Sequence, residues 1–264
     1  MQLAVSALAW NAEDETRALE LLQREGVRCI EHIPSRAAGA GPRLKEHGLT
    51  CVGFQALLHG TTGLHLFETA ETRAALGAHL GSVCRLGREL GARELVFGSP
   101  KNRFIPDGYG RERALEVAGE FFRAAGAIAE TQACWICLEP NPSAYGCNFL
   151  VTTAETAAFV EGLGASGVKL NVDAGALVMN GEDPRRVLDG RLKRIGHVHA
   201  SEPELKPVGS LPHTRDSHRA LAETLRGIGY AGVVSIEMLR PKDAPWEQAL
   251  LEAIHFTREA YGLS

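Results

Sequence analysis

Four side chains that bind metals well follow four short apolar runs in the second half of the chain. Residues 135–138 lead to Glu139, and the next three runs end on Asp173, His199 and Glu237. An apolar run that stops at a polar residue is typical of a buried strand, whose end delivers that residue to the edge of a sheet. Three carboxylates and one imidazole suit a divalent ion such as Mn, Mg, Co or Zn. Each residue alone could be an ordinary solvated strand end, so it is the ordered set of four that predicts one metal site.

The length and charge of the chain limit what such a site could belong to. A chain of 264 residues fits one α/β barrel, and no linker divides it, so we expect a single domain over residues 1–264. A net charge of −4 argues against a nucleic-acid partner, because phosphate binding favours a basic surface. No stretch approaches the ~20 apolar residues of a membrane span, and the N-terminal residues are typical of a strand rather than a signal peptide. We therefore expect a cytoplasmic protein with no membrane partner.

Most of the six cysteines lie inside apolar runs, which is typical of buried, reduced thiols in a cytoplasmic protein. Cys134 and Cys137 match a CxxC motif. Residues three apart on a strand point to opposite faces, so these two can share neither a disulfide nor a metal. Cys147 follows in an expected loop and is the single candidate for an exposed thiol.

Apolar runs and amphipathic stretches alternate along the whole chain. Strands are expected at residues 3–8, 27–30, 49–54, 94–97, 135–138, 168–173, 195–199 and 233–237. Helices are expected at residues 13–24, 42–46, 68–90, 111–132, 152–161, 184–188, 218–228 and 246–261. Strict alternation predicts parallel strands with right-handed crossovers, and eight units of this length favour a closed (β/α)8 TIM barrel. All strands then end at one rim, where the four metal-binding side chains would converge.

A glycine-rich motif at residues 162–167 matches the dinucleotide fingerprint GxGxxG in sequence only. That fingerprint needs a strand before it and a helix after it, whereas the expected order here is helix, glycines, strand. We interpret the segment as a helix end and a loop. Residues 57–67, rich in Gly, Thr and His, are expected to form a functional loop, in which His59 and His65 either contact the rim or lie exposed at the surface.

Several polar residues near the expected strand ends could contact a substrate or support the ligands. His197 has the same strand parity as His199, so it should point into the barrel one layer deeper. Lys101 and Arg103 could hold a phosphate or a carboxylate, although solvated loop cations are more common. Tyr145 could equally be a packing residue of its loop. The full set of candidates for substrate binding is Asn141, Tyr145, Lys101, Arg103 and Glu202.

Taken in order, the motifs CLEPNP, NVDAGAL, HVHASEP and SIEML resemble those of the xylose-isomerase-like TIM barrel superfamily. The segments IEHIPSRA and VFGSPKNR extend the resemblance to the sugar phosphate isomerase/epimerase family, so that it spans essentially the whole chain. The resemblance implies that Glu139, Asp173, His199 and Glu237 hold one divalent metal ion. In ketose 3-epimerases of this superfamily the two glutamates also exchange the substrate proton, which implies Glu139 and Glu237 as the catalytic pair.

Two positions differ from the ketose 3-epimerases. Those enzymes carry a substrate-binding His three residues after the metal Asp, and an Arg six residues after the metal His, where this chain has Ala176 and Leu205. The proton-transfer residues are thus kept while the residues around the substrate differ. We expect a metal-dependent isomerase or epimerase that works next to a carbonyl through an enediolate. Its substrate would be a small carbohydrate, such as a polyol, cyclitol or modified sugar.

Other functions stay open at this point. The same metal and bases could expel a leaving group, as in a lyase or dehydratase that acts on an oxidised sugar or an inosose. A nuclease like endonuclease IV is less favoured, because that family binds several zinc ions through more His and Asp ligands and needs a basic groove. A barrel without activity is disfavoured by the four intact ligands. A homo-oligomer is compatible with the sequence.

Overall fold

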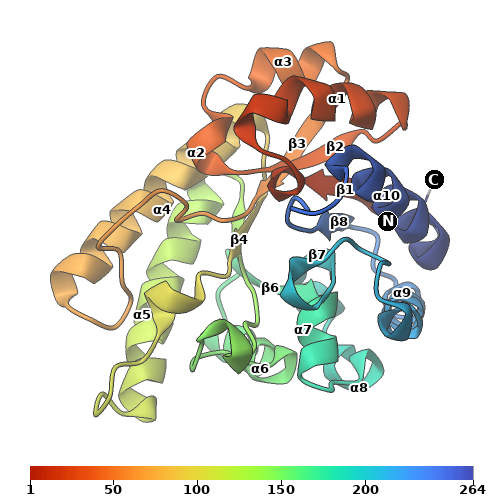
Figure 1. Cartoon of the computed structure of the whole chain (residues 1–264). Coiled ribbons are helices and arrows are strands. Elements are labelled where there is room, and N and C mark those ends of the chain that lie inside the picture. The colour runs from red at the N-terminus through yellow and green to blue at the C-terminus, as the bar shows by residue number, and fades with distance from the viewer. Residues whose placement is uncertain (264) are drawn as a thin grey trace.

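Each strand pairs in parallel with the next one along the chain, and the last strand pairs with the first (Figure 1). The computed structural model describes residues 1–263. The barrel strands are β1 (Gln2–Ser6), β2 (Cys29–His32), β3 (Thr50–Phe54), β4 (Glu94–Phe97), β5 (Trp135–Leu138), β6 (Val168–Asp173), β7 (Ile195–Ser201) and β8 (Val233–Glu237). The sheet is a closed barrel in the order β1 to β8, which confirms the predicted (β/α)8 fold.

Helices surround this barrel, as Figure 1 shows. They are α1 (Glu15–Arg24), α2 (Pro34–Ala37), α3 (Gly41–Glu46), α4 (Ala70–Leu90), α5 (Arg111–Thr131), α6 (Thr153–Leu163), α7 (Ala174–Met179), α8 (Pro184–Leu188), α9 (Arg215–Gly227) and α10 (Trp246–Tyr261). Seven 3-10 turns complete the described elements: η1 (Ala7–Ala9), η2 (Ala12–Asp14), η3 (Pro100–Arg103), η4 (Ser143–Tyr145), η5 (Leu192–Arg194), η6 (Pro203–Leu205) and η7 (Pro212–Thr214). No helix within residues 1–263 has the length and apolar character to cross a membrane.

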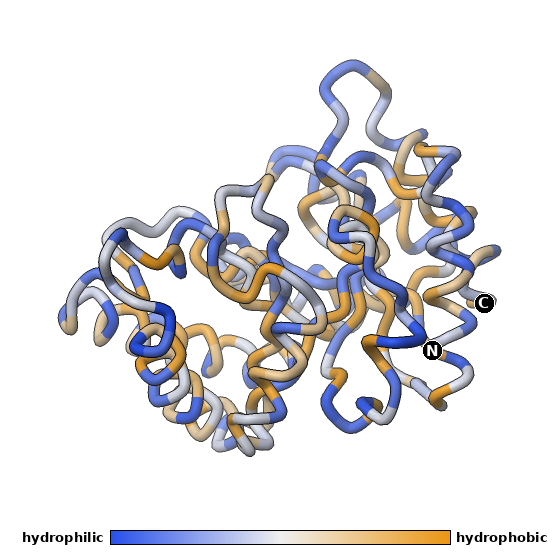
Figure 2. The backbone as a smooth tube through the Cα atoms, turned by 90° about the horizontal axis from the view of Figure 1, so that it is seen from below, coloured by the Kyte–Doolittle hydropathy of each residue, from blue (hydrophilic) through white to orange (hydrophobic). Residues whose placement is uncertain are grey.

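The helix α4 illustrates how local sequence sets these elements. It starts after Thr69, whose side chain accepts a hydrogen bond from the Thr72 backbone N–H. It ends at Gly91, whose φ of 80° is readily adopted by glycine. Its apolar residues bury one face against the barrel, with Leu76, Leu80, Val83 and Cys84 all buried. The main core lies in the layer between strands and helices, and in Figure 2 hydrophobic residues alternate with hydrophilic ones along the outer helices.

The register of the strands decides which side chains meet at the rim of the barrel. On β5 the residues of one parity, Trp135 and Cys137, point inward, and Glu139 continues that parity at the rim. Gly196 interrupts the pairing of β6 with β7, where the register shifts between Leu170 and Asn171. A Cβ at Gly196 would lie 2.7 Å from Cys137 Sγ, so this position requires glycine. Beyond the shift, Asp173 pairs with His199. The register therefore sets two predicted ligands side by side.

The cysteines correct one expectation. All six are free and buried within the part of the chain that the structure describes. Cys147 is only 3% exposed and its Sγ donates to the Phe149 carbonyl at 3.2 Å, so the prediction of an exposed thiol is wrong. The loop that carries Cys147 turns this side chain inward rather than toward solvent. Cys134 contacts the Ala129 carbonyl of α5, whereas Cys137 faces the barrel interior, and the two thus occupy opposite faces as predicted.

Candidate metal centre

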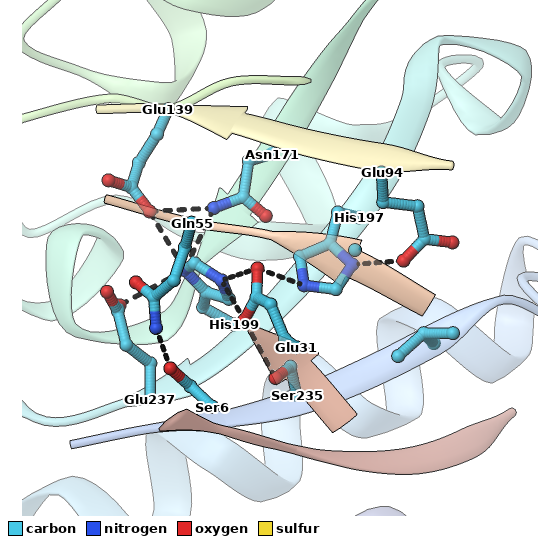
Figure 3. Close-up of polar contacts among 12 residues, drawn as sticks. Ser6, Glu31, Gln55, Glu94, Glu139, Asn171, His197, His199, Ser235 and Glu237 are labelled. Atoms are coloured by element: carbon cyan, nitrogen blue, oxygen red, sulfur yellow. Dashed lines mark hydrogen bonds and ion pairs between the residues drawn. The ribbon is translucent and has the colours of Figure 1, made fainter. Parts of the chain in front are cut away.

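The side chains of Glu139, Asp173, His199 and Glu237 meet at the rim formed by the ends of β5 to β8. Each offers one ligand atom, and these atoms all lie within 4.8 Å of one another. His199 Nδ1 is the common neighbour, at 2.8 Å from Glu139 Oε1 and 3.0 Å from Glu237 Oε2 (Figure 3). Asp173 Oδ2 lies 3.9 Å from the same nitrogen. One imidazole nitrogen thus faces three carboxylates.

The charges of this cluster do not balance. Burial, together with the charges of Glu139 and Glu237, raises the pKa of Asp173 to about 8. Burial also raises the pKa of Glu237, although the neighbouring His199 opposes this. Burial would lower the pKa of His199, but the surrounding carboxylates outweigh it and raise that pKa well above its usual value. One imidazolium offsets a single negative charge, so three gathered carboxylates fit a site that also holds a cation.

A second row of polar residues fixes the orientation of His199 from inside the barrel (Figure 3). Its Nε2 lies 3.1 Å from Glu31 Oε2, which also accepts a hydrogen bond from Ser235 Oγ at 2.9 Å. A carboxylate only accepts hydrogen bonds, so Nε2 would keep its proton toward Glu31 when a metal takes the place of the proton on Nδ1, and His199 would then be neutral. His197 Nε2 approaches Glu31 at 3.3 Å, and His197 Nδ1 lies 2.5 Å from Glu94 Oε2.

These contacts form one buried series, Glu94 to His197 to Glu31 to His199, that runs from the start of β4 toward the rim. His197, His199 and Glu31 are each fully buried. Burial opposes a charge on His197, but the carboxylates of Glu31 and Glu94 outweigh it and raise its pKa to about 9. Glu31, His197 and His199 also place ligand atoms within 4.8 Å of one another. The hydrogen bond between His199 and Glu31 and the ion-pair contact between His197 and Glu31 account for this proximity, and we interpret the group as support for His199.

A cavity of about 450 Å³ opens directly above the cluster. Glu139, Asp173 and Glu237 line its floor. Its walls are largely apolar, because Pro140, Pro142, Leu205 and Leu239 contribute to them. A volume of this size is in the range of sites that bind one small molecule. Whatever binds here would lie directly against the carboxylates.

Three of the predicted substrate-binding residues line this cavity: Asn141, Tyr145 and Glu202. Asn141 Nδ2 lies 3.5 Å from Glu139 Oε2, close to the cluster. The Tyr145 hydroxyl accepts a hydrogen bond from the Glu204 backbone N–H at 2.7 Å, which holds the ring at the wall. Glu202 Oε1 accepts from the Gly209 N–H at 2.9 Å, so one of its oxygens is occupied by the loop.

The two predicted loop cations lie elsewhere. Lys101 lines a separate cavity together with His65 and Phe104. Arg103 is fully buried and donates a hydrogen bond to the Glu139 carbonyl at 2.6 Å. Arg103 therefore holds the backbone of the strand end that carries Glu139, and a direct contact of either cation with a substrate stays a prediction.

Several residues that surround the ligands were not identified from sequence. Asn171 Nδ2 donates to Glu139 Oε1 at 2.8 Å, and Gln55 donates to Ser6 beside the cluster (Figure 3). Asn171 precedes Asp173 by two residues, so strand parity could have placed it inside the barrel. Glu94 opens its strand at the opposite end from the rim, and no sequence signal connects it with His197, 103 residues away.

A family model described as "Xylose isomerase-like TIM barrel" matches residues 19–260. None of the curated protein sequences matches the chain significantly. Among solved structures, D-psicose 3-epimerase from Clostridium cellulolyticum H10 with D-tagatose superposes with a TM-score of 0.82 at 17% identity over 99% of both chains. The 3-keto-D-glucoside 4-epimerase from E. coli gives 0.82 at 16% identity over 98% of this chain and 99% of that chain.

The IOLI protein with a bound zinc atom gives a TM-score of 0.76 at 18% identity over 99% of this chain and 98% of that chain. Likeness at these identities shows a common fold. The family model covers most of the chain, from the middle of α1 to the last turn of α10. The protein therefore belongs to the family of xylose isomerase-like TIM barrels.

Proposed function

We propose that the protein is an isomerase or epimerase that needs one divalent metal ion and acts on a sugar or a sugar-like polyol. The observation that carries this proposal is the position of Glu139 and Glu237. They come from β5 and β8, approach the same nitrogen of His199 at 2.8 and 3.0 Å, and line the same cavity. Two carboxylates on two sides of one substrate site suit removal of a proton from one face of a carbon and its return to the other.

The metal would be held by Glu139, Asp173, His199 and Glu237. When bound, such an ion would stabilise the negative charge that develops on a substrate oxygen next to the carbon that loses its proton. Glu31 would keep the ring of His199 fixed by accepting from Nε2, and Asn171 would orient Glu139 by donating to Oε1. The excess of carboxylates and the raised pKa of Asp173 support a cation at this point.

The cavity walls support a substrate other than a free ketohexose. Leu205 lines the cavity where ketose 3-epimerases would place an Arg, and Leu239, Pro140 and Pro142 extend the apolar surface. A buried hydroxyl group without a partner is costly, so such walls favour a substrate with apolar faces. We propose a cyclitol, a keto-glycoside or another modified sugar. Two of the structural neighbours, a 3-epimerase and a 3-keto-glucoside 4-epimerase, support this class of chemistry.

The test is a panel of ketoses, cyclitol ketones and keto-glycosides incubated in D2O with Mn, Mg, Co or Zn. Mass spectrometry would follow deuterium at carbon, and direct metal analysis would confirm loading. We expect one substrate class to gain deuterium at carbon without losing water. We expect the Glu237→Gln variant to lose this exchange. Loss of water from the product would assign a dehydratase instead. The absence of exchange across the panel with every metal would contradict the proposal.

A further inference from the structure

A second cavity, of about 440 Å³, lies at the opposite end of the barrel from the carboxylate cluster. It is formed where β5 and β6 begin, by the turn before β4 that carries Arg93, and by the turn η5 before β7. The side chains of Trp135 and Lys169 point into it from the first residues of their strands. Because Trp135 and Glu139 stand at opposite ends of β5, this cavity is distinct from the candidate metal centre.

Four cations line this cavity: Arg93, Lys169, Lys193 and Arg194. The only acid in its lining is Glu130, whose carboxylate already accepts a hydrogen bond from Ser166 Oγ. Within residues 1–263 none of the four cations has a carboxylate within ion-pair distance, and none makes a side-chain hydrogen bond. The chain as a whole has a net charge of −4. A concave site lined by four cations and one hydrogen-bonded carboxylate therefore has the opposite charge to the chain.

Trp135 gives two of these cations fixed places. Lys169 Nζ lies 4.1 Å from the centre of its ring, and Arg93 Cζ lies 4.8 Å from it. The indole Nε1 donates to the Gly196 carbonyl at 3.3 Å, which anchors the ring to β7. A cation held against a fixed ring loses little freedom when it meets an anion, so the site is organised before any ligand arrives.

We propose that this cavity binds the phosphate group of a small phosphorylated molecule. The four cations come from three separate segments of chain and face one volume from different sides. Such an arrangement suits a tetrahedral phosphate, whose oxygens point in several directions, whereas a planar carboxylate is satisfied by one guanidinium fork. The cavity volume fits one small molecule. The inference goes beyond the proposed function, because it concerns neither the metal ligands nor their cavity.

Binding can be followed through Trp135. The chain has three tryptophans, and Trp10 and Trp246 are only 2% and 4% exposed, while Trp135 is half-buried. Iodide is an anion and should concentrate among the four cations, so it should quench Trp135 more strongly than neutral acrylamide does. Inorganic phosphate, added to the metal-loaded protein at constant ionic strength, should saturably protect Trp135 from iodide. The Trp135→Phe variant should lose the quenching signal. Quenching by iodide that phosphate leaves unchanged would overturn the proposal.

Calorimetric titration with inorganic phosphate supplies a second measurement. The double variant Lys193→Ser/Arg194→Ser should bind phosphate about tenfold or more weakly, since hydrogen bonds to charged groups are strong. The matched control, Arg43→Ser/Lys45→Ser, removes the same two charges from exposed positions on α3 and should bind as the wild type does. Equal affinity in the Lys193/Arg194 variant would place the phosphate elsewhere, for example at the metal, and would overturn the proposal. Tighter binding of citrate than of phosphate would overturn the assignment to phosphate.

Discussion

At the scale of single residues, His199 joins the two parts of the polar interior. Its Nδ1 faces the carboxylates at the rim, and its Nε2 faces Glu31 inside the barrel. Each nitrogen therefore has a different task, because a ring held by one carboxylate presents its second nitrogen in a fixed direction. The acids at the rim divide in the same way. All three line the cavity, but both oxygens of Asp173 already accept hydrogen bonds, from the Ala176 N–H and from Ser201 Oγ.

This division predicts different effects for similar substitutions. Glu139→Gln and Glu237→Gln keep an oxygen donor but remove the basicity, so proton exchange at the substrate carbon should fall about 10² to 10⁴-fold even with metal bound. Asp173→Asn should act mainly by weakening metal binding, and excess metal should restore much of its activity. The measurement is turnover at saturating metal, with the metal content of each variant determined directly. Near wild-type turnover of metal-loaded Glu237→Gln would show that Glu237 is only a ligand.

A second prediction concerns Glu31, which does not line the cavity above the carboxylates but holds His199. Glu31→Gln leaves His199 without its charged acceptor, so metal affinity should fall about 10 to 100-fold. Ser235→Ala is the control, because it removes only the neutral hydrogen bond to the same carboxylate. Metal titration by calorimetry should show a much smaller change for Ser235→Ala. Equal metal affinity in Glu31→Gln and wild type would contradict the positioning role.

At this scale, the sequence predicts a residue's position when that position depends on its own strand, and fails when it depends on a contact with a distant strand. Parity along one strand correctly placed His197 inside the barrel, one layer below His199, because the repeat of two residues is set by the strand itself. Its partner Glu94 was not predictable, since the pair forms only when β4 and β7 face each other across the closed barrel. Arg103 shows the same limit. Its sequence suggested a solvated or ligand-binding cation, but the loop buries it under the Glu139 carbonyl.

At the scale of elements, close backbone contacts set how helices sit on the barrel. A Cβ at Gly126 of α5 would lie 2.7 Å from Val168 Cγ2 and 3.2 Å from the Gly167 carbonyl carbon. The helix can therefore approach β6 only without a side chain at that position. The sequence predicted α5 within one residue, but it did not predict α7, whose run AGALVM follows Asp173 directly. Most of α7 is buried, so it lacks the polar face that marks a surface helix.

The glycine contact leads to a paired prediction. Gly126→Ala should destabilise the protein by about 1 to 3 kcal/mol, because the added methyl group overpacks the contact between α5 and β6. Gly162→Ala, in the last turn of α6, is the matched control. A Cβ there meets nothing within 4 Å, so the higher helix propensity of Ala should stabilise the protein by up to about 1 kcal/mol. Urea unfolding of both variants gives the sign of each change, and stabilisation by Gly126→Ala would contradict the packing argument.

At the scale of the whole molecule, the barrel encloses several charged side chains. Barrels of this class commonly fill their interior with branched apolar residues, whereas here a separate apolar cluster of described residues is small and consists of Ala4, Cys29 and Val233 near the strand starts. Above them lie Glu31, His197 and then the rim carboxylates. The hydrophobic core is instead the layer between strands and helices. Stability thus comes mainly from that outer layer, while the interior holds gathered negative charge that a cation would offset.

Metal should therefore stabilise the whole fold. A ligand that binds only the folded state contributes about 2.7 kcal/mol at a free concentration 100 times its Kd. For a chain of this size we expect the melting temperature to rise by about 5 to 10 °C between chelator and saturating metal. Thermal unfolding followed by circular dichroism, with each of Mn, Mg, Co and Zn, measures this rise and ranks the ions.

Two variants show whether the rise comes from the rim carboxylates. Glu237→Gln removes a predicted ligand, so its melting temperature should respond much less to metal at the same concentration. Glu204→Gln is the control, because Glu204 lines the same cavity but its side chain is 71% exposed and lies outside the ligand cluster. It should keep the wild-type response. A full response in Glu237→Gln, or an equal loss in Glu204→Gln, would mean that the stabilising ion binds somewhere other than among Glu139, Asp173, His199 and Glu237.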